Sequence, residues 1–550
     1  MARLRKLLVA FYLMLIACQC VSAQESGLVN DSISRQSAEK PPQESYSISQ
    51  QINAVFTPFV NSLASVLFWD PFSASGIYDK VMRDENGQPF INDKGQFVEA
   101  PLKLIVVWLI FGGLFFTIFM RFINVRGFVH AIHLIRGKYS HKEHAGEVSH
   151  CEALATALSA TVGLGNIAGV AIAVAIGGPG ATIWMILAGL LGMSSKFTEC
   201  TLGVKYRKIN DKGEVSGGAM YYLRDGLKKK KLGWLGHLLA FTFAILVIGG
   251  SVGGGNMLQA NQAFKQFESF FPVMKENGFW YGVVMALLVG IVIIGGIKSI
   301  ARVTSKMVPF MAILYVGTSL IIIGMNISNL PHAFSIIWNG AFSADAMKGG
   351  FLGVLIFGFQ RGAFSNEAGV GSASIAHSAA RTNEPVSEGI VSLLEPFVDT
   401  VIICTMTALV IIFTGFSENT QGLEGVELTS AAFASVFNWF PYLLLVAVTL
   451  FAFSTMISWS YYGQKGFDYL FGGYSERFFK TRRVSDTAFQ LIFLFAIIIG
   501  SSSSLNSVMD FSDMMVLCMA FPNIIGLLIL APEVKRDLDN YWKKLKNKEL

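Results

Sequence analysis

Long apolar runs alternate with short polar segments along almost the whole chain. A helix needs about 20 mostly apolar residues to cross the hydrocarbon core of a bilayer. Eleven runs meet this requirement and predict membrane-spanning helices, at about residues 102–123, 152–176, 180–203, 234–264, 279–297, 307–327, 349–378, 388–415, 440–462, 485–502 and 509–531. The chain is therefore expected to be an all-α polytopic membrane protein with one transmembrane domain over residues 102–531.

Composition and charge support this interpretation. The 550 residues are 53% hydrophobic and 15% charged, whereas soluble domains average about 25% charged residues. Lys and Arg concentrate in every second loop and in the tail at 532–550. Because basic loops stay on the cytoplasmic side, we expect a cytoplasmic C-terminus and a multi-pass protein of a bacterial inner membrane. The net charge of +6 comes from these loops and needs no nucleic acid as partner.

Residues 1–23 have a basic start, an apolar centre and small residues at the end, which is the pattern of a secretory signal peptide. Cleavage is expected after Ala23, and lipoprotein-type processing before Cys18 is the alternative. Either would export residues 24–101, whose Ser/Gln/Glu-rich start predicts partial disorder.

Two of the predicted spans carry polar residues and glycines near their centres. An ionised side chain at the centre of a membrane helix costs about 2.5–3.5 kcal/mol, and such residues mark functional sites. The polar positions are Gln360, Arg361, Ser365, Asn366 and Glu367 in one span and Thr161, Gly163, Gly165 and Asn166 in the other. A broken helix is tolerated where it lines a cavity. Close packing through Gly165 and Gly169 is the alternative for the second span.

The two interrupted spans are the second and the seventh of the eleven, and each opens a set of five. Five is odd, so the two sets run in opposite directions through the membrane. This arrangement predicts an inverted-repeat secondary transporter with one extra N-terminal helix and a binding site between the two breaks. The ends of half-helices favour a carboxylate there, and hydroxyls and free carbonyls favour a hard cation.

Other polar positions leave alternatives open. Ser454 and Thr455 are cation ligands or hydroxyls bonded to their own helix, and Trp459 walls a pocket or packs. The polar face around Asn256, Gln259, Asn261 and Gln262 lines the pathway or serves helix contacts.

Charged residues inside the spans raise the question of their partners. We expect Lys196 to pair with Glu199, and Arg361 with Glu367, whereas Asp399 has no obvious partner. A Walker A motif and metal-ligand spacings are missing from the sequence, and no nucleophile–base pair stands out in a span. A secondary transporter is therefore favoured over a pump, a channel or an enzyme.

The ordered motifs together resemble the alanine/glycine:cation symporter family: TVGLGNIAGVA, GMSSKFTECTLGVKYR, GGAMYYL, RGAFSNEAGVGSASIAHSAA, FSTMISWSYYG and FPNIIGLLIL. The resemblance implies a LeuT-type fold with a 5+5 inverted repeat and Na⁺-driven import of alanine or glycine. Alternating access would move spans 2, 3, 7 and 8 as a bundle. Leu164 departs from the family, which usually has Thr at this position.

The resemblance also implies the site residues. Na⁺ would be held by Ser454 and Thr455 with carbonyls of the second span. The amino acid would be held by the two breaks and the tryptophan, that is by Thr161, Gly163, Gly165, Asn166, Phe364, Ser365, Asn366, Glu367 and Trp459.

Overall fold

The computed structural model describes residues 102–547, apart from 140–142, 212, 276, 343–350, 421 and 424, together with short stretches between residues 56 and 89. The chain divides into Met1–Tyr46 and Ser47–Leu550, and the following concerns the second unit. The expected signal peptide and most of the expected exported segment lie outside the described residues.

The described part is almost entirely helical, and seven of its helical stretches are long and apolar enough to cross a membrane. They are α9 (Ala181–Lys205), α12–α13 (Gly233–Phe270), α15 (Gly296–Met325), α19–α21 (Pro385–Phe413), α23–α24 (Phe440–Phe479), α25 (Arg483–Ser502) and α26–α27 (Leu505–Lys546). An eighth is a bent pair, α7 (His150–Thr161) followed by Leu164–Gly177, which contains α8 (Ala168–Gly177).

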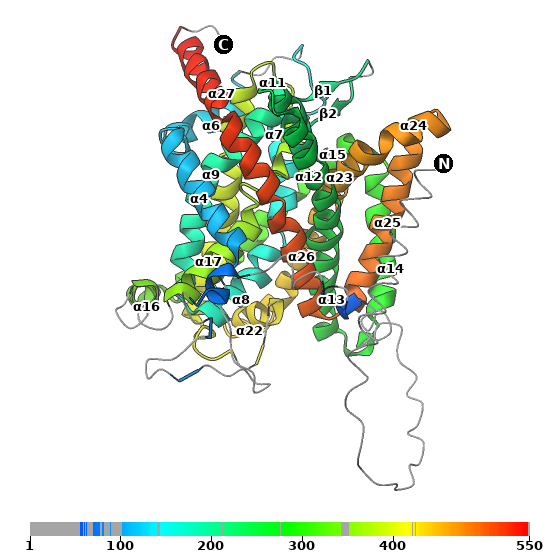
Figure 1. The fold of residues 1–550 in the computed structure, drawn as a ribbon. Helices are drawn as coiled ribbons and strands as arrows, with labels where there is room; N and C mark the ends of the chain where they lie inside the picture. Colours follow the sequence, from blue (N-terminus) through cyan, green and yellow to red (C-terminus); the bar gives the residue numbers. More distant parts are fainter. Residues whose placement is uncertain are drawn as a thin grey trace, which may run out of the picture. The chain divides into compact units, whose positions relative to one another are not determined.

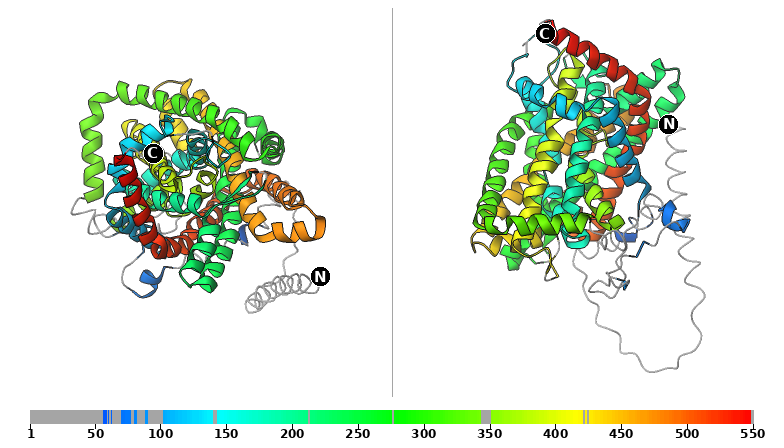
Figure 2. Two further views of the ribbon diagram at one scale, coloured as in Figure 1. Left: turned by 90° about the horizontal axis from the view of Figure 1, so that it is seen from above. Right: turned by 90° about the vertical axis from the view of Figure 1, so that its left-hand side faces the viewer.

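Shorter helices complete the described fold. Two are apolar, α4 (Leu104–Phe119) and α14 (Gly278–Ile293). The others used below are α6 (Phe128–Ile135), α16 (Leu330–Phe342), α17 (Phe351–Asn366), α18 (Ala373–His377), α20 (Leu394–Pro396) and α22 (Val426–Ala434). Strands β1 (Lys208–Ile209) and β2 (Val215–Ser216) form a small antiparallel pair with Lys208 opposite Ser216. Figures 1 and 2 show that most long helices share one general direction, while α16 lies across it.

Helices occupy all eleven predicted regions, but length and composition qualify eight as spans, so the count of eleven and the inverted repeat stay predictions. Two boundaries differ from expectation. The predicted loop at 298–306 is helical because α15 begins at Gly296. The helix α27 (Ala520–Lys546) passes through Pro532, so the expected tail continues the last helix.

Polar and apolar residues are distributed as a lipid environment requires. Large apolar side chains on the outside are strongly exposed, for example Ile291 at 75% and Ile294 at 76%. Charged residues lie inside instead, and Lys196, Glu388 and Asp399 are each 0% exposed. Many large apolar side chains are exposed together in this way, which supports a membrane protein.

Two glycines of the polar span, Gly358 and Gly362, lie within α17 and serve helix packing. A Cβ atom on Gly358 would lie 2.6 Å from the carbonyl oxygen of Ala181 on α9. One on Gly362 would lie 3.0 Å from the Cβ atom of Ala188. Small residues therefore bring α17 close to α9.

Candidate functional site

The first interruption lies between α7 and α8, whose axes differ by 56°. Helix α7 ends at Thr161, and a single 3₁₀ turn at Leu164–Asn166 leads into α8. The Asn166 side-chain oxygen accepts a hydrogen bond from the Gly163 amide at 2.9 Å. The Leu164 amide donates to Gln259 Oε1 at 3.1 Å. The predicted break is present, and Asn166 stabilises it.

The second interruption follows Asn366, where α17 ends. Glu367, Gly369 and Gly371 have φ angles of 54°, 84° and 97°, and α18 begins at Ala373. The left-handed conformation is readily available to glycine and rare for other residues. Asn366 Oδ1 accepts from the Ala368 amide at 2.9 Å, which holds the turn. The break is present as expected, but it lies after the polar run instead of within it.

Asp399 joins the two interruptions. Asn166 Nδ2 donates to Asp399 Oδ1 at 2.6 Å, and Ser365 Oγ donates to Oδ2 at 2.8 Å. Thr400 Oγ1 also donates to Oδ2, at 2.7 Å, and accepts from Asn366 Nδ2 at 3.1 Å. All partners of this carboxylate are neutral, and among the described residues it has no ion pair within 4.0 Å. The sequence indicated no partner for Asp399, and the structure shows three neutral donors to its carboxylate.

Trp459 of α23 (Phe440–Phe467) reaches the second interruption. Its Nε1 donates to Glu367 Oε1 at 3.2 Å, and Ser372 Oγ donates to Glu367 Oε2 at 2.5 Å. A Cβ atom on Gly255 would lie 2.1 Å from Trp459 Cγ, so the indole packs directly on this backbone. Trp459 therefore packs on one helix, which is one of its two alternatives, and its polar edge contacts the break; its role as a pocket wall stays a prediction.

The expected pairing of Arg361 with Glu367 is wrong. Arg361 Nη1 donates to Asp513 Oδ1 at 3.2 Å, and Nη2 pairs with Oδ2 of the same carboxylate. Gln360 Nε2 adds a hydrogen bond to Oδ2 at 3.0 Å. Because Asp513 lies on α26, the charge of Arg361 is balanced by a residue 152 positions away, which spacing along one helix cannot indicate.

The two hydroxyls of α23 have different partners. Ser454 Oγ donates to the Phe451 carbonyl of its own helix at 3.0 Å. Thr455 Oγ1 donates across to the Ser159 carbonyl of α7 at 3.0 Å. The hydroxyl of Thr161 bonds back to the Ala157 carbonyl at 3.2 Å. Ser454 Oγ also contacts Met311 Sδ of α15 at 3.5 Å, and of the three hydroxyls that of Thr455 is the one that bonds to α7 from another helix, close to the first break.

The polar residues of the fourth predicted span also differ in the groups that they contact. Asn256 donates to the carbonyl of Phe493 in the middle of α25 (2.6 Å), and Asn261 to that of Ser503 at its C-terminal cap (2.7 Å). Gln259 instead reaches the first break, and Gln262 lines a pocket. That pocket contains two predicted site residues, Gly165 and Phe364, and its other lining residues are Leu164, Ala168, Gly169, Ile172, Leu258, Gln262, Arg361, Leu505 and Met509.

The geometry defines a class of protein, a multi-pass helical membrane protein with two broken helices facing one another through a buried carboxylate. The sequence matches the model of the sodium:alanine symporter family over residues 86–550. The chain therefore belongs to the sodium:alanine symporter family.

Individual relatives agree. The chain is 38% identical over 460 residues to the sodium/alanine symporter AgcS of Methanococcus maripaludis, covering 83% of this chain and 98% of that one. It is 34% identical over 451 residues to the probable sodium/glutamine symporter GlnT of Bacillus subtilis, covering 81% and 89%. A solved structure of MhsT with L-phenylalanine shares 16% identity at a TM-score of 0.48, covering 68% and 88%. That score is too low to assign the fold.

Proposed function

We propose that this protein imports a small neutral amino acid, alanine or glycine, together with Na⁺, by alternating access at the two helix breaks. One observation supports this most: Asp399 hydrogen-bonds to Asn166 beside one break and to Ser365 beside the other. A ligand that alters this junction acts on both broken helices at once. Family membership supplies the class of substrate.

The proposed substrate groups match the chemistry of the breaks. Helices α8 and α18 begin at Ala168 and Ala373, so the positive ends of their dipoles lie at the breaks and favour a carboxylate. Phe364 and Trp459 bring bulky rings to the same region and limit the side chain that fits. Leu164 is 1% exposed and brings an apolar side chain to the first break, which favours an apolar side chain such as the methyl group of alanine.

The coupling ion is proposed to interact with oxygen atoms of α7 and α23. Hydroxyl and carbonyl oxygens suit hard cations, and Thr455 Oγ1 and the Ser159 carbonyl supply one of each across the helix interface. Ser454 adds a hydroxyl one residue earlier. When bound, Na⁺ would supply positive charge and coordination to oxygen atoms on both helices.

Asp399 has a second electrostatic role in the proposal. A buried carboxylate without a cationic partner is costly, and its three hydrogen bonds come from neutral groups. The negative charge of Asp399 therefore attracts a positive charge, either that of the coupling ion or that of the substrate ammonium group. Binding shifts the conformational equilibrium only if the ligand prefers the closed state.

The test is uptake of labelled L-alanine into liposomes that contain the purified protein. An inward Na⁺ gradient should drive accumulation, and replacing Na⁺ with choline should abolish it. A proton gradient without Na⁺ forms a second arm, and unlabelled glycine, L-serine, D-alanine and L-glutamine serve as competitors. Accumulation driven by protons alone would contradict Na⁺ coupling, and stronger competition by glutamine than by glycine would contradict the small substrate.

A further inference from the structure

Five charged or titratable side chains form a buried cluster at the ends of the broken helices that point away from the breaks. His150 is the first residue of α7, and His377 is the last of α18. Glu388 lies on α19 (Pro385–Val391), Glu395 on α20 and Lys196 on α9. None is more than 4% exposed. The helices involved correspond to predicted spans 2, 3, 7 and 8.

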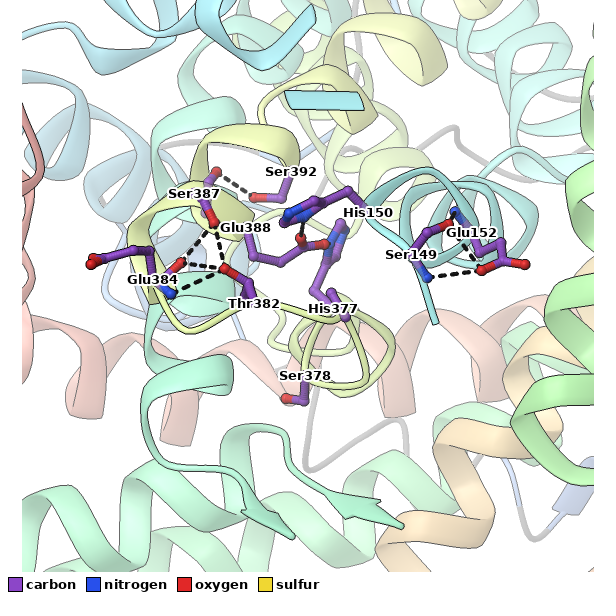
Figure 3. Close-up of polar contacts among 12 residues, drawn as sticks. Ser149, His150, Glu152, His377, Ser378, Thr382, Glu384, Ser387, Glu388 and Ser392 are labelled. Atoms are coloured by element: carbon purple, nitrogen blue, oxygen red, sulfur yellow. Dashed lines mark hydrogen bonds and ion pairs between the residues drawn. The ribbon is translucent and has the colours of Figure 1, made fainter. Parts of the chain in front are cut away.

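The contacts form a continuous chain. Both imidazoles approach Glu388 through Nδ1, as Figure 3 shows, and the distance from His377 Nδ1 to Glu388 Oε1 is 2.6 Å. The other ring nitrogen of His377 lies 3.5 Å from Glu395 Oε2. Lys196 Nζ lies 3.1 Å from Glu395 Oε1. The expected pairing of Lys196 with Glu199 is therefore wrong, since the ion pair of Lys196 is with Glu395.

The two histidines differ in what surrounds their rings. A neutral imidazole has one N–H donor and one nitrogen lone pair, whereas an imidazolium has two donors. His377 Nδ1 hydrogen-bonds to Glu388, while Nε2 lies 3.5 Å from Glu395 Oε2, which is an ion-pair distance and not a hydrogen bond. A neutral ring with its proton on Nδ1 would therefore place a lone pair beside a second carboxylate. His150 contacts a carboxylate through Nδ1, and a ring with a proton on Nδ1 satisfies that contact whether or not Nε2 is also protonated. The geometry thus favours a proton on both nitrogens of His377.

The charges support the same assignment. With His377 protonated, the positive charges of Lys196 and His377 balance the negative charges of Glu388 and Glu395. Loss of that proton leaves a net negative charge in a fully buried site. Removing one partner of a buried ion pair leaves the other charge uncompensated, so the proton is held strongly.

Further charged and titratable groups surround the cluster. Glu199 of α9 accepts from Asn523 Nδ2 at 3.1 Å, and any negative charge on it also favours the proton. Arg207, beyond the end of α9, donates to the carbonyl oxygens of Ser378 and Thr382 at 2.8 Å. Glu367 interacts electrostatically with Lys196 and Glu395, and any negative charge on it also favours the proton. Three further titratable neighbours are neutral when protonated: Cys200 of α9, Tyr222 of the π-helical segment Tyr222–Gly226 and Tyr462 of α23.

We infer that His377 is a proton-binding site. Its proton holds together α7, α18, α19 and α20 at the end of the bundle that points away from the breaks. The proton site stands independently of the proposed function. Its role as a latch rests on that function, because the cluster lies entirely within the four spans that are proposed to move together, and the proton would keep them together as one body.

The protonation state is tested by NMR of ¹³C-histidine-labelled protein in detergent, which has eight histidines to resolve. The His377→Gln variant identifies the signal; if it does not fold, replacing the other histidines one at a time identifies it by elimination. We expect an imidazolium signal from His377 at pH 7.5, about one unit above the ordinary titration range of histidine. Glu395→Gln should move its titration to lower pH by at least about one unit.

Glu384→Gln is the matched control, because Glu384 forms a partly exposed ion pair with Lys544 outside the cluster. A neutral His377 signal at pH 7.5, or a titration that Glu395→Gln leaves in place, would overturn the proton site. Neither result depends on transport.

The latch has a separate reporter in Cys200, which is buried beside the cluster, while Cys151 at the start of α7 is exposed. Maleimide labelling at pH 7.5 is quantified for each cysteine by peptide mass spectrometry. Cys200 should be labelled at least about fivefold faster in Glu395→Gln than in the unaltered protein. A fivefold change corresponds to roughly 1 kcal/mol in an opening equilibrium. Labelling of Cys151 should not change. Equal Cys200 rates would refute the latch.

Discussion

Buried carboxylates occur in two regions of this molecule, and the two regions differ in whether cationic side chains lie beside them. At the ends of the broken helices that point away from the breaks, Glu388 and Glu395 lie beside Lys196 and His377. The negative charges there are balanced by positive charges of the protein itself. At the breaks, Asp399 receives three hydrogen bonds from neutral groups and no ion pair within the described part of the chain. We expect the first arrangement to stabilise the bundle, and we propose that the second receives the positive charge of a ligand.

The largest expected effect is on stability, at the balanced cluster. Lys196→Met removes the partner of Glu395 and should lower the free energy of unfolding by about 3–5 kcal/mol. Thermal unfolding in detergent measures this, with the exposed Lys546→Met as control. An unfolding temperature equal to that of the control would contradict the proposed difference between the two regions, because it would show that the cluster contributes nothing to stability.

Asp399→Asn should show the opposite pattern. The amide has nearly the same shape, so the unfolding temperature should stay close to that of the unaltered protein. Uptake should fall about 10- to 100-fold, since hydrogen bonds to a charged group contribute about 1.5–3 kcal/mol. Asp539→Asn, an exposed acid on α27, is the control. Full uptake in Asp399→Asn would show that its charge has no role in transport.

A smaller effect separates the two hydroxyls of α23. Thr455→Ala removes the group that bonds to α7, and it should raise the Na⁺ concentration for half-maximal uptake about tenfold, the effect of roughly 1.4 kcal/mol. Ser454→Ala, whose hydroxyl bonds to its own helix, should raise it less. No shift in Thr455→Ala would place the ion elsewhere, and an equal shift in both variants would contradict the stronger role of Thr455.

The smallest effect concerns a buried histidine without an acidic partner. His130 on α6 contacts Tyr541 through Nε2 at 2.9 Å, and burial, with His133 and Lys138 nearby, lowers the pKa of His130 to about 4. The unfolded chain takes up this proton near pH 6.5, so the stabilisation is complete above that pH and is lost as pH falls toward 4. The unfolding temperature should drop more between pH 7 and pH 5 in the unaltered protein than in His130→Gln.

The sequence revealed those features of the site that depend on local composition. Both interruptions were predicted, because glycines next to Asn166 and Glu367 cannot form a regular lipid-facing helix. The partners of the buried charges were not, because each lies on another helix: Lys196 pairs with a residue 199 positions away and Arg361 with one 152 positions away. Spacing within one helix suggested nearer partners and was wrong both times.

Asp399 illustrates the same limit at the site. It stood out in the sequence as an acid inside an apolar span, yet its donors come from two other predicted spans and from the next residue. Only the packing of α17 and the first break against this helix brings them together.

The central claim is that the two breaks and the charge of Asp399 form one site for substrate and ion. Equilibrium binding of labelled L-alanine to the purified protein, titrated with Na⁺ and compared with Asp399→Asn, tests it most directly. We expect alanine binding that requires Na⁺ in the unaltered protein and that loses its dependence on Na⁺, together with most of its affinity, in Asp399→Asn. Binding with the same affinity and the same Na⁺ dependence in both proteins would contradict the account.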